Sequence, residues 1–322
     1  MMFYLENKFN ILYYNIHHLF IMDPSKFLIS PSELIDLLKD KNNLKHIRII
    51  DGTSYPPLDP RSRTDSFKQS RIPYSQLFDI DLIATVPHPI PHMMPNNETF
   101  ITHMKRLDLR KSDRIIIYDR VSMFASPRVW FTLYYFGHRN IQILNGGFPA
   151  YEKLSGPLEM GDTAYGYETL ITERQSLPLK EDDYQYELEK GKVLDLKAIV
   201  KNECNDEIID ARHEDRYNGK VDEPRKSLRV GHVEGAKCVF FKHLFNEQGE
   251  YLDKDKLEEV FKSKGVDLNK NVIAYCGTGL TACIDLFAIA LIGKADKCKL
   301  YDASWAEYGN TSLEDIEKIK KE

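Results

Sequence analysis

An internal repeat constrains the fold of this chain more than any other feature of its sequence. An apolar run that ends in aspartate occurs at Ile49–Asp51 and again at Ile208–Asp210. A second apolar run follows each of them after a nearly equal interval, at Ile115–Asp119 and at Val272–Cys276. Self-similarity along a chain is the signature of a repeated structural unit. The chain is therefore predicted to contain two copies of one domain.

The similarity of the two halves continues downstream of the second apolar run. Asp119 and Cys276 are each followed by a helical pattern and then by a short strand-like run. That run ends at Asn145 in the first half and at Asp302 in the second, at equal distances from Asp119 and Cys276. Short apolar runs that alternate with helical patterns are typical of a parallel sheet covered by helices. We expect an α/β fold in which each copy is a mainly parallel sheet with helices on both faces.

Length and composition predict the domain boundaries. The 322 residues suffice for two domains, which we place at 24–153 and 184–322. The segment 154–183 between them contains several Gly and Pro residues and little periodicity, so it is predicted to be a linker. Residues 1–23 stay unassigned, because they have neither the composition of a targeting signal nor the continuous apolar character of a transmembrane helix.

Three helices are predicted from the sequence pattern. Each half is expected to begin with a helix, at Pro31–Lys39 in the first half and at Leu194–Lys201 in the second. Ser30 has the chemistry of an N-cap, and the proline after it suits the first position of a helix. The third helix is predicted at Cys283–Ile292, after the last long apolar strand.

Charge and cysteine usage narrow the classes of function. A formal net charge of −5 gives no basic footprint for nucleic acid, and no run of like charge suggests binding to a membrane. The five cysteines have irregular spacing and include no CxxC pair, which argues against a disulfide framework or a zinc site and favours a reducing compartment. No motif for a metal or an organic cofactor is present, so we expect no cofactor and a small-molecule substrate.

The segment Cys276–Ala282 has the pattern of a reactive loop. It lies between a predicted strand and a predicted helix, at the edge of a parallel sheet where ligands bind. Gly277 and Gly279 allow the backbone to turn tightly and direct its N–H groups inward. A Cys276 thiolate would face these N–H groups and the positive end of the helix dipole, which lower the pKa of the thiol and stabilise an anion or a persulfide. Asp119 is the equivalent residue of the first half and no glycine directly follows it, so the first copy is expected to have lost this cradle.

Two alternatives to a reactive thiol exist for this loop. Cys276 could be a buried structural cysteine, since free cysteine is among the most buried residue types. A protein phosphatase also holds an anion in a cysteine loop, but it needs an arginine at the end of the loop to bind phosphate. Here the sixth residue after Cys276 is Ala282, and Tyr275 stands where a histidine is usual. These residues disfavour a phosphatase.

Further motifs in both halves match one known pattern. They are Phe78–Asp81, His92–Pro95, Ser126–Trp130, Asp210–Arg212, Asp215–Tyr217, Glu223–Arg225, Gly231–Ala236, Cys276–Ala282 and Tyr301–Trp305. Together, over about residues 24–312, they resemble the rhodanese family, and in particular its tandem-domain members that use 3-mercaptopyruvate. The resemblance implies an inactive first domain, a catalytic cysteine at Cys276 in the second, and an active site in the cleft between them.

The resemblance also implies which donor is used. Members that use thiosulfate carry Arg and Lys directly after the cysteine, whereas Gly277 and Thr278 look like the type that uses 3-mercaptopyruvate. Arg216 and Arg225 fall on the positions whose guanidinium groups hold the carboxylate and the ketone of that substrate. The loop residues expected to bind substrate and transferred sulfur are Gly277, Gly279, Leu280 and Thr281.

Two residues of the first half are implied to assist the cysteine. Asp81 and His92 match residues that form a hydrogen-bonded chain with the loop hydroxyl, here Thr278. In such a chain the carboxylate orients the imidazole, and the imidazole polarises the hydroxyl. The sequence departs from the family pattern at Ser70–Tyr74, where relatives have Gly-His-Ile-Pro-Gly, but this departure touches none of these groups.

The expected activity is therefore sulfur transfer through a persulfide on Cys276. Sulfur would come from 3-mercaptopyruvate, pyruvate would leave, and a thiol acceptor such as thioredoxin or a small thiol, or cyanide, would take the sulfur. A thiosulfate sulfurtransferase of the same fold and a non-catalytic rhodanese-like binding protein are the alternatives. Cysteine usage favours the cytoplasm, and a mitochondrial location stays open because the N-terminus is unassigned.

Overall fold

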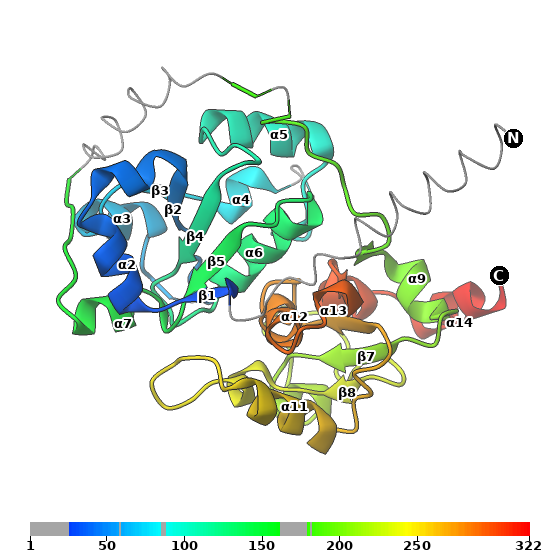
Figure 1. Ribbon diagram of the computed structural model, residues 1–322. Helices are drawn as coiled ribbons and strands as arrows, with labels where there is room; N and C mark the ends of the chain where they lie inside the picture. The colour runs from blue at the N-terminus through cyan, green and yellow to red at the C-terminus, as the bar shows by residue number, and fades with distance from the viewer. Residues whose placement is uncertain (1–25, 58, 85–87, 162–178, 181) are drawn as a thin grey trace, which may run out of the picture.

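The protein is built on two five-stranded sheets (Figure 1). The computed structural model describes residues 26–57, 59–84, 88–161, 179–180 and 182–322. Every strand pair within the two sheets is parallel. Helices lie against both sheets, which confirms the α/β fold expected from the alternation of apolar runs and helical patterns.

The first sheet has the strand order β1-β5-β4-β2-β3. Its strands are β1 (Leu28–Ile29), β2 (Ile47–Asp51), β3 (Ser75–Leu77), β4 (Arg114–Tyr118) and β5 (Ile141–Leu144). The helices of this half are α2 (Pro31–Leu38), η2 (Lys41–His46), α3 (Arg63–Gln69), α4 (Ile80–Ile83), α5 (Asn97–Arg106), α6 (Ser126–Tyr135) and α7 (Gly147–Lys153).

The second sheet has the order β6-β10-β9-β7-β8, which repeats the first sheet strand for strand. Its strands are β6 (Val193–Leu194), β7 (Glu207–Asp210), β8 (Lys237–Cys238), β9 (Val272–Tyr275) and β10 (Cys298–Tyr301). The helices are α9 (Leu196–Lys201), α10 (Glu214–Tyr217), η3 (Phe241–Leu244), α11 (Lys254–Ser263), α12 (Ala282–Leu291), η4 (Ala295–Lys297), α13 (Ser304–Tyr308) and α14 (Leu313–Lys321). The matching order confirms the predicted duplication.

The central strand β4 shows how each sheet is covered on both faces. Ile115 and Ile117 belong to a core that includes residues of α5 and α6, whereas Ile116 and Tyr118 belong to a smaller core with residues of α2 and α7. Successive side chains of a strand point to opposite faces of its sheet, which accounts for the alternation. The long apolar runs of the sequence follow from burial on both faces.

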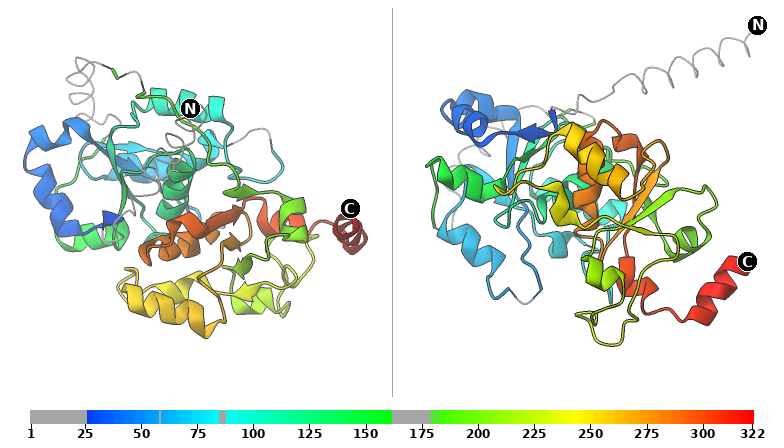
Figure 2. Two further views of the ribbon diagram at one scale, coloured as in Figure 1. Left: turned by 45° about the vertical axis from the view of Figure 1, so that its right-hand side comes forward. Right: turned by 90° about the horizontal axis from the view of Figure 1, so that it is seen from below.

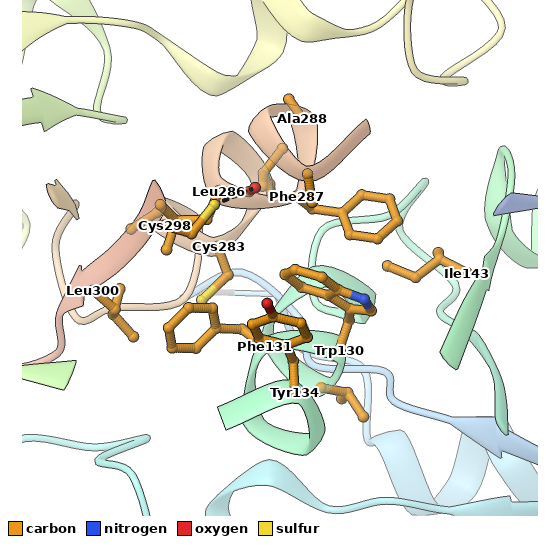
Figure 3. Packing of buried hydrophobic residues seen from close by; sticks show 14 of the residues in the cluster. Trp130, Phe131, Tyr134, Ile143, Cys283, Leu286, Phe287, Ala288, Cys298 and Leu300 are labelled. Carbon is orange, nitrogen blue, oxygen red and sulfur yellow. Dashed lines mark hydrogen bonds between the residues drawn. The ribbon is translucent and has the colours of Figure 1, made fainter. Parts of the chain in front are cut away.

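The two halves share one hydrophobic core through their equivalent helices α6 and α12 (Figures 1 and 2). Trp130 of α6 and Phe287 of α12 pack edge to face, with ring centroids 4.9 Å apart. Figure 3 shows Phe131 and Tyr134 of α6 next to Trp130, facing Cys283 of α12. Because α6 and α12 each follow a central strand, this packing brings the two central loops to the domain interface.

The predicted helix starts are partly right. The helix expected at Pro31–Lys39 is α2, and Ser30 caps it as predicted, since the Ser30 Oγ accepts a hydrogen bond from the Glu33 N–H at 3.2 Å. The prediction that each half begins with a helix was wrong, because β1 and β6 come first. Leu194 is the last residue of β6, and Asp195 caps α9. Strands of two residues are too short to give a periodic pattern.

Parts of the predicted N-terminal extension and linker lie outside the described residues, namely 1–25, 162–178 and 181. After the linker, the chain first packs on the first half, where the Tyr186 hydroxyl donates to the Leu109 carbonyl at 3.0 Å. The proposed domain boundaries therefore stay predictions. No helix in the described part of the chain has the length and apolar character that a membrane span requires.

Candidate active site

Cys276 lies directly after β9, in the loop that leads to α12, and only 2% of its surface is exposed. Its backbone N–H donates to the Ser304 Oγ at 3.1 Å, and its carbonyl accepts from the Trp305 N–H at 3.0 Å. The next carbonyl, of Gly277, accepts from the Ala306 N–H at 3.0 Å. The start of α13 thus holds the cysteine end of the loop in place.

The other end of the loop depends on the glycine at position 279. Gly279 has a φ of +77°, a conformation that favours glycine. A Cβ atom at this position would lie 2.6 Å from the Asp302 carbonyl oxygen, so a larger residue would also clash with the neighbouring strand end. Thr281 precedes α12 without a side-chain capping bond, and the Cys283 and Ile284 N–H groups donate to the loop carbonyls of Leu280 and Thr281 at 3.2 Å and 3.0 Å. The positive end of the helix dipole still lies at this loop. Such a helix start favours an anion.

The equivalent loop of the first half corrects one expectation from the sequence. Asp119 is fully buried, and its carboxylate accepts hydrogen bonds from the N–H groups of Val121, Met123, Ala125 and Ser126 at 2.7–3.0 Å. The Ser126 Oγ donates a further bond at 2.7 Å. The prediction that this copy has lost its cradle was therefore wrong. The loop still directs its N–H groups inward, and the Asp119 carboxylate fills the space.

Positive φ angles replace the missing glycines in this first loop. Ser122 and Met123 have φ values of 47° and 69°. Few residues other than glycine adopt this region, and the bonds to Asp119 compensate for the strain. By the repeat, the N–H groups of Thr278 and Leu280 correspond to those of Val121 and Met123, which donate to Asp119.

Arg216 lies beside the catalytic loop. A Cβ atom at Gly277 would be 3.5 Å from the Arg216 Nη2 atom, which places the guanidinium next to the residue that follows Cys276. Two bonds to Glu223 orient this guanidinium, with Nη2 to Oε2 at 2.5 Å and Nε to Oε1 at 3.2 Å. About a quarter of the Arg216 side chain is exposed, so the group is both held and accessible.

Arg225 is exposed and lies within electrostatic reach of the same loop. Partial desolvation lowers the pKa of its guanidinium, the negative charge of a Cys276 thiolate raises it, and the nearby Arg216 lowers it. Arg216 is placed beside the loop by its distance from Gly277, and Arg225 interacts electrostatically with both Arg216 and Cys276. Two cations beside a thiol suit a negatively charged donor.

Glu223 is a residue of the site to which the sequence alone assigned no role. The buried Arg212 donates to Glu223 Oε1 at 2.8 Å and to Asp210 Oδ2 at 2.6 Å, so the strand end of β7 fixes the carboxylate that orients Arg216. Asp210 and Arg212 therefore have a structural role, since their bonds tie the end of β7 to the segment that carries Glu223. The only signal for Glu223 was its position two residues before Arg225.

Asp81 and His92 of the first half are in contact. The His92 Nδ1 lies 2.5 Å from the Asp81 Oδ1, and Arg63 pairs with the other carboxylate oxygen. The His92 ring, and then the Arg63 guanidinium, hold the pKa of Asp81 well below its usual range against the opposing effect of burial. Asp81 is therefore a charged partner for the imidazole at neutral pH.

The second link of the predicted chain, from His92 to Thr278, is not formed in the described part of the molecule. Thr278 is half-buried, and no described hydrogen bond joins its hydroxyl to the His92 ring. The backbone connects the two regions instead, because Arg128 donates to the carbonyl of His92 and, at 3.1 Å, to the carbonyl of Gly279. Arg128 is a contact that sequence reasoning missed.

Leu280 and Thr281 complete the loop. Leu280 is buried in the shared core, and Thr281 is the half-buried residue before α12. Among the described residues, no group of His, Cys, Asp and Glu side chains is arranged to hold a metal ion. A cysteine in a glycine loop, at the start of a helix and beside two arginines, defines the class of a nucleophilic group-transfer enzyme.

Comparisons with known proteins identify the family. The model of the rhodanese-like domain matches residues 30–154 and 193–311. The chain belongs to the rhodanese family, with two such domains in tandem, and it is a sulfurtransferase.

Curated relatives match over most of the chain. It is 31% identical over 288 residues to the 3-mercaptopyruvate sulfurtransferase of Escherichia coli K12, covering 88% of this chain and 97% of the relative. It is 30% identical to the mitochondrial thiosulfate/3-mercaptopyruvate sulfurtransferase 1 of Arabidopsis thaliana, covering 90% of this chain and 79% of the relative. The relatives thus include a bacterial and a mitochondrial protein.

Solved structures show the same architecture. The Tum1 protein of Saccharomyces cerevisiae has a TM-score of 0.74 at 29% identity, with 90% of this chain and 96% of that chain covered. The 3-mercaptopyruvate sulfurtransferase SseA of Escherichia coli has a TM-score of 0.71 at 30% identity, with 88% and 100% covered. The fold and the family rest on agreement along nearly the whole length of both proteins.

Proposed function

We propose that this sulfurtransferase takes sulfur from 3-mercaptopyruvate, carries it as a persulfide on Cys276 and passes it to a thiol acceptor. The observation that supports this most is the position of Cys276. Its loop joins β9 to the uncapped start of α12, and Arg216 lies beside the next residue. A thiolate, a persulfide and an α-keto acid are all anions, and this environment favours each of them.

The first half-reaction forms the persulfide. The Cys276 thiolate attacks the sulfur of 3-mercaptopyruvate, and the carbon–sulfur bond breaks with its electron pair moving to carbon. The sulfur keeps its proton as the outer thiol of the persulfide, and the enolate of pyruvate takes one proton to become pyruvate. Arg216 and Arg225 hold the carboxylate and the ketone, and the ketone oxygen carries the charge of the enolate.

The loop backbone stabilises the anions. The N–H groups of the loop from Gly277 to Thr281 would surround the ionised persulfide. The repeat supports this for Thr278 and Leu280, because the equivalent N–H groups of Val121 and Met123 donate to the Asp119 carboxylate. Thr278, with His92 and Asp81 behind it, would move the proton, since catalytic hydrogen bonds often tighten only when substrate is bound. The contact between Asp81 and His92 supports the first part of this relay.

The second half-reaction regenerates the enzyme. The thiolate of an acceptor such as thioredoxin or a small thiol attacks the outer sulfur, the sulfur–sulfur bond breaks, and the Cys276 thiolate leaves. Cyanide would take the same sulfur as thiocyanate. A reducing cytoplasm suits this chemistry. The mitochondrion is the alternative location, because one relative is a mitochondrial protein.

Parallel turnover assays test the donor. Initial rates would be measured with 3-mercaptopyruvate and with thiosulfate, each with a thiol acceptor and with cyanide. The neutral Gly277-Thr278 pair predicts a clear preference for 3-mercaptopyruvate. A preference for thiosulfate would overturn the donor assignment while keeping Cys276, and a lack of turnover with both would favour the non-catalytic binding protein.

A further inference from the structure

The contacts between the two domains are nearly symmetric. The Met94 N–H of the first domain donates to the Asp302 Oδ2 of the second at 2.6 Å. In return, the Tyr251 N–H of the second domain donates to the Asn145 Oδ1 of the first at 3.2 Å. Asn145 and Asp302 are equivalent residues of the repeat, at the same distance from the ends of their central strands. Each domain therefore donates a backbone hydrogen bond to the equivalent residue of the other domain.

The symmetry is broken on the helices that form the interface. Arg128 of α6 and Asp285 of α12 stand at equivalent positions. Arg128, with 1% of its surface exposed, pairs with the Asp302 Oδ1 at 2.7 Å and donates to the carbonyls of Gly279 and His92. Asp285 is fully buried, and neither of its carboxylate oxygens has a hydrogen-bond partner in the described part of the chain. Of these two equivalent side chains, Arg128 alone donates to the loop of the other domain in the described part of the chain.

The guanidinium of Arg128 is packed against the catalytic loop. Its Nη1 atom donates to Gly279, and a Cβ atom at Gly279 would lie 3.0 Å from it. The same Nη1 pairs with Asp302, which lies two residues before Ser304, the acceptor of the Cys276 N–H. The buried guanidinium of Arg128 therefore holds the Gly279 end of the loop in a fixed position relative to Ser304, which holds the Cys276 end.

We propose that Arg128, from the domain without the catalytic cysteine, is a positioning residue that sets the geometry of the Cys276 loop. The inference deepens the proposed function, because it assigns the first domain a role in aligning the loop that would hold the persulfide. The planar fork of arginine serves Gly279, Asp302 and His92 at once, which an ammonium group on a flexible stem does not. The carbonyl of His92 on the same fork also joins the Asp81–His92 pair to this loop.

The test separates positioning from simple stabilisation of the interface. Arg128→Lys keeps the charge beside Asp302 but loses the fork. The double variant Arg128→Met/Asp302→Asn removes both charges, so that no lone carboxylate is left buried. Asn145→Ala is the matched control, because it deletes the equivalent hydrogen bond to Tyr251 on the other side of the interface. Thermal unfolding would establish that each variant is folded.

Two readouts follow the loop itself. Hydrogen–deuterium exchange of the segment 277–282 reports its order, whether or not the chosen donor is the right one. The rate of Cys276 alkylation by iodoacetamide reports the reactivity of the thiol, and turnover with 3-mercaptopyruvate separates kcat from KM.

The inference predicts that Arg128→Lys and the double variant speed exchange in the loop and slow the alkylation of Cys276 by about 10-fold at constant pH. It also predicts a kcat lower by about 100-fold at nearly unchanged KM, the size expected when a remote change misplaces a reacting group. Asn145→Ala should match the wild type in all three readouts.

Wild-type exchange and alkylation in Arg128→Lys, or equal changes in Asn145→Ala, would overturn the positioning role. If the wild-type protein shows no turnover with 3-mercaptopyruvate but the loop still loses order in Arg128→Lys, the positioning role stands and the proposed donor is refuted.

Discussion

Asp119 and Cys276 stand at equivalent positions after the central strands β4 and β9, but only the first fills its loop with its own charge. The Asp119 carboxylate accepts bonds from four backbone N–H groups and the Ser126 hydroxyl. A thiol has no such set of acceptors, so the loop of the second domain is suited to take up an additional anion. Duplication has produced one loop closed by a carboxylate and one in which the proposed sulfur chemistry takes place.

Replacing Asp119 is expected to destabilise the protein without touching the catalytic loop. In Asp119→Asn an amide NH₂ takes the place of the oxygen that accepts from Ala125 and from Ser126, and it cannot accept. The free energy of unfolding should fall by about 3 kcal/mol, the cost of leaving buried donors of a charged acceptor unpaired. Urea unfolding would measure it, with the exposed Asp36→Asn as control. Equal stability of Asp119→Asn and wild type would contradict the filled-loop interpretation.

Asp285 should make stability fall as the pH rises. Burial, together with the nearby charges of Cys276 and Asp210, raises the pKa of its carboxyl well above the usual value. A folded state that keeps this proton loses stability above the ordinary pKa of an aspartate, because the unfolded chain then releases the proton while the folded chain retains it. Asp285→Leu removes this penalty.

The expected gain for Asp285→Leu is about 1–3 kcal/mol and is larger at pH 8 than at pH 5. Urea unfolding at the two pH values measures the difference, and the exposed Asp255→Leu on α11 serves as the control. A variant that is less stable than wild type at pH 8 would show that Asp285 has a stabilising partner.

Arg216 should matter for binding and for the transition state. Arg216→Met is expected to lower kcat/KM for 3-mercaptopyruvate about 100-fold, since it removes a forked cation that Glu223 orients beside the loop. Lys226→Met, at an exposed cation next to Arg225, is the matched control and should leave kcat/KM unchanged. Equal effects of the two variants would mean that only the overall charge of the region matters.

His92 should affect proton movement. His92→Asn suits the positive φ of this position, because asparagine tolerates the left-handed region, and it removes the imidazole. Loss of a positioned proton-transfer group is expected to lower kcat about 100-fold, with a changed pH profile. His46→Asn, at an exposed histidine far along the sequence from the site, is the control. A normal pH profile in His92→Asn would remove His92 from the relay.

The sequence predicted the duplicated α/β fold because long buried strands leave long apolar runs, as at Ile115–Asp119 and Val272–Cys276. It did not predict β1 and β6, since two residues cannot show a period. The interaction of Arg128 with Gly279 could not be derived either, because sequence spacing carries no information on how two domains pack. The closed loop of Asp119 was missed because positive φ angles at Ser122 and Met123 were not expected without glycine.

The proposed persulfide can be observed directly by intact-protein mass spectrometry after brief exposure to 3-mercaptopyruvate without an acceptor. The account predicts that the wild-type chain gains the mass of one sulfur atom, that the gain maps to Cys276, and that a thiol acceptor or cyanide removes it. Cys276→Ser should gain nothing, whereas Cys204→Ser, at the exposed cysteine, should behave as the wild type. A wild-type chain without added sulfur, or sulfur that still appears in Cys276→Ser, would contradict the account.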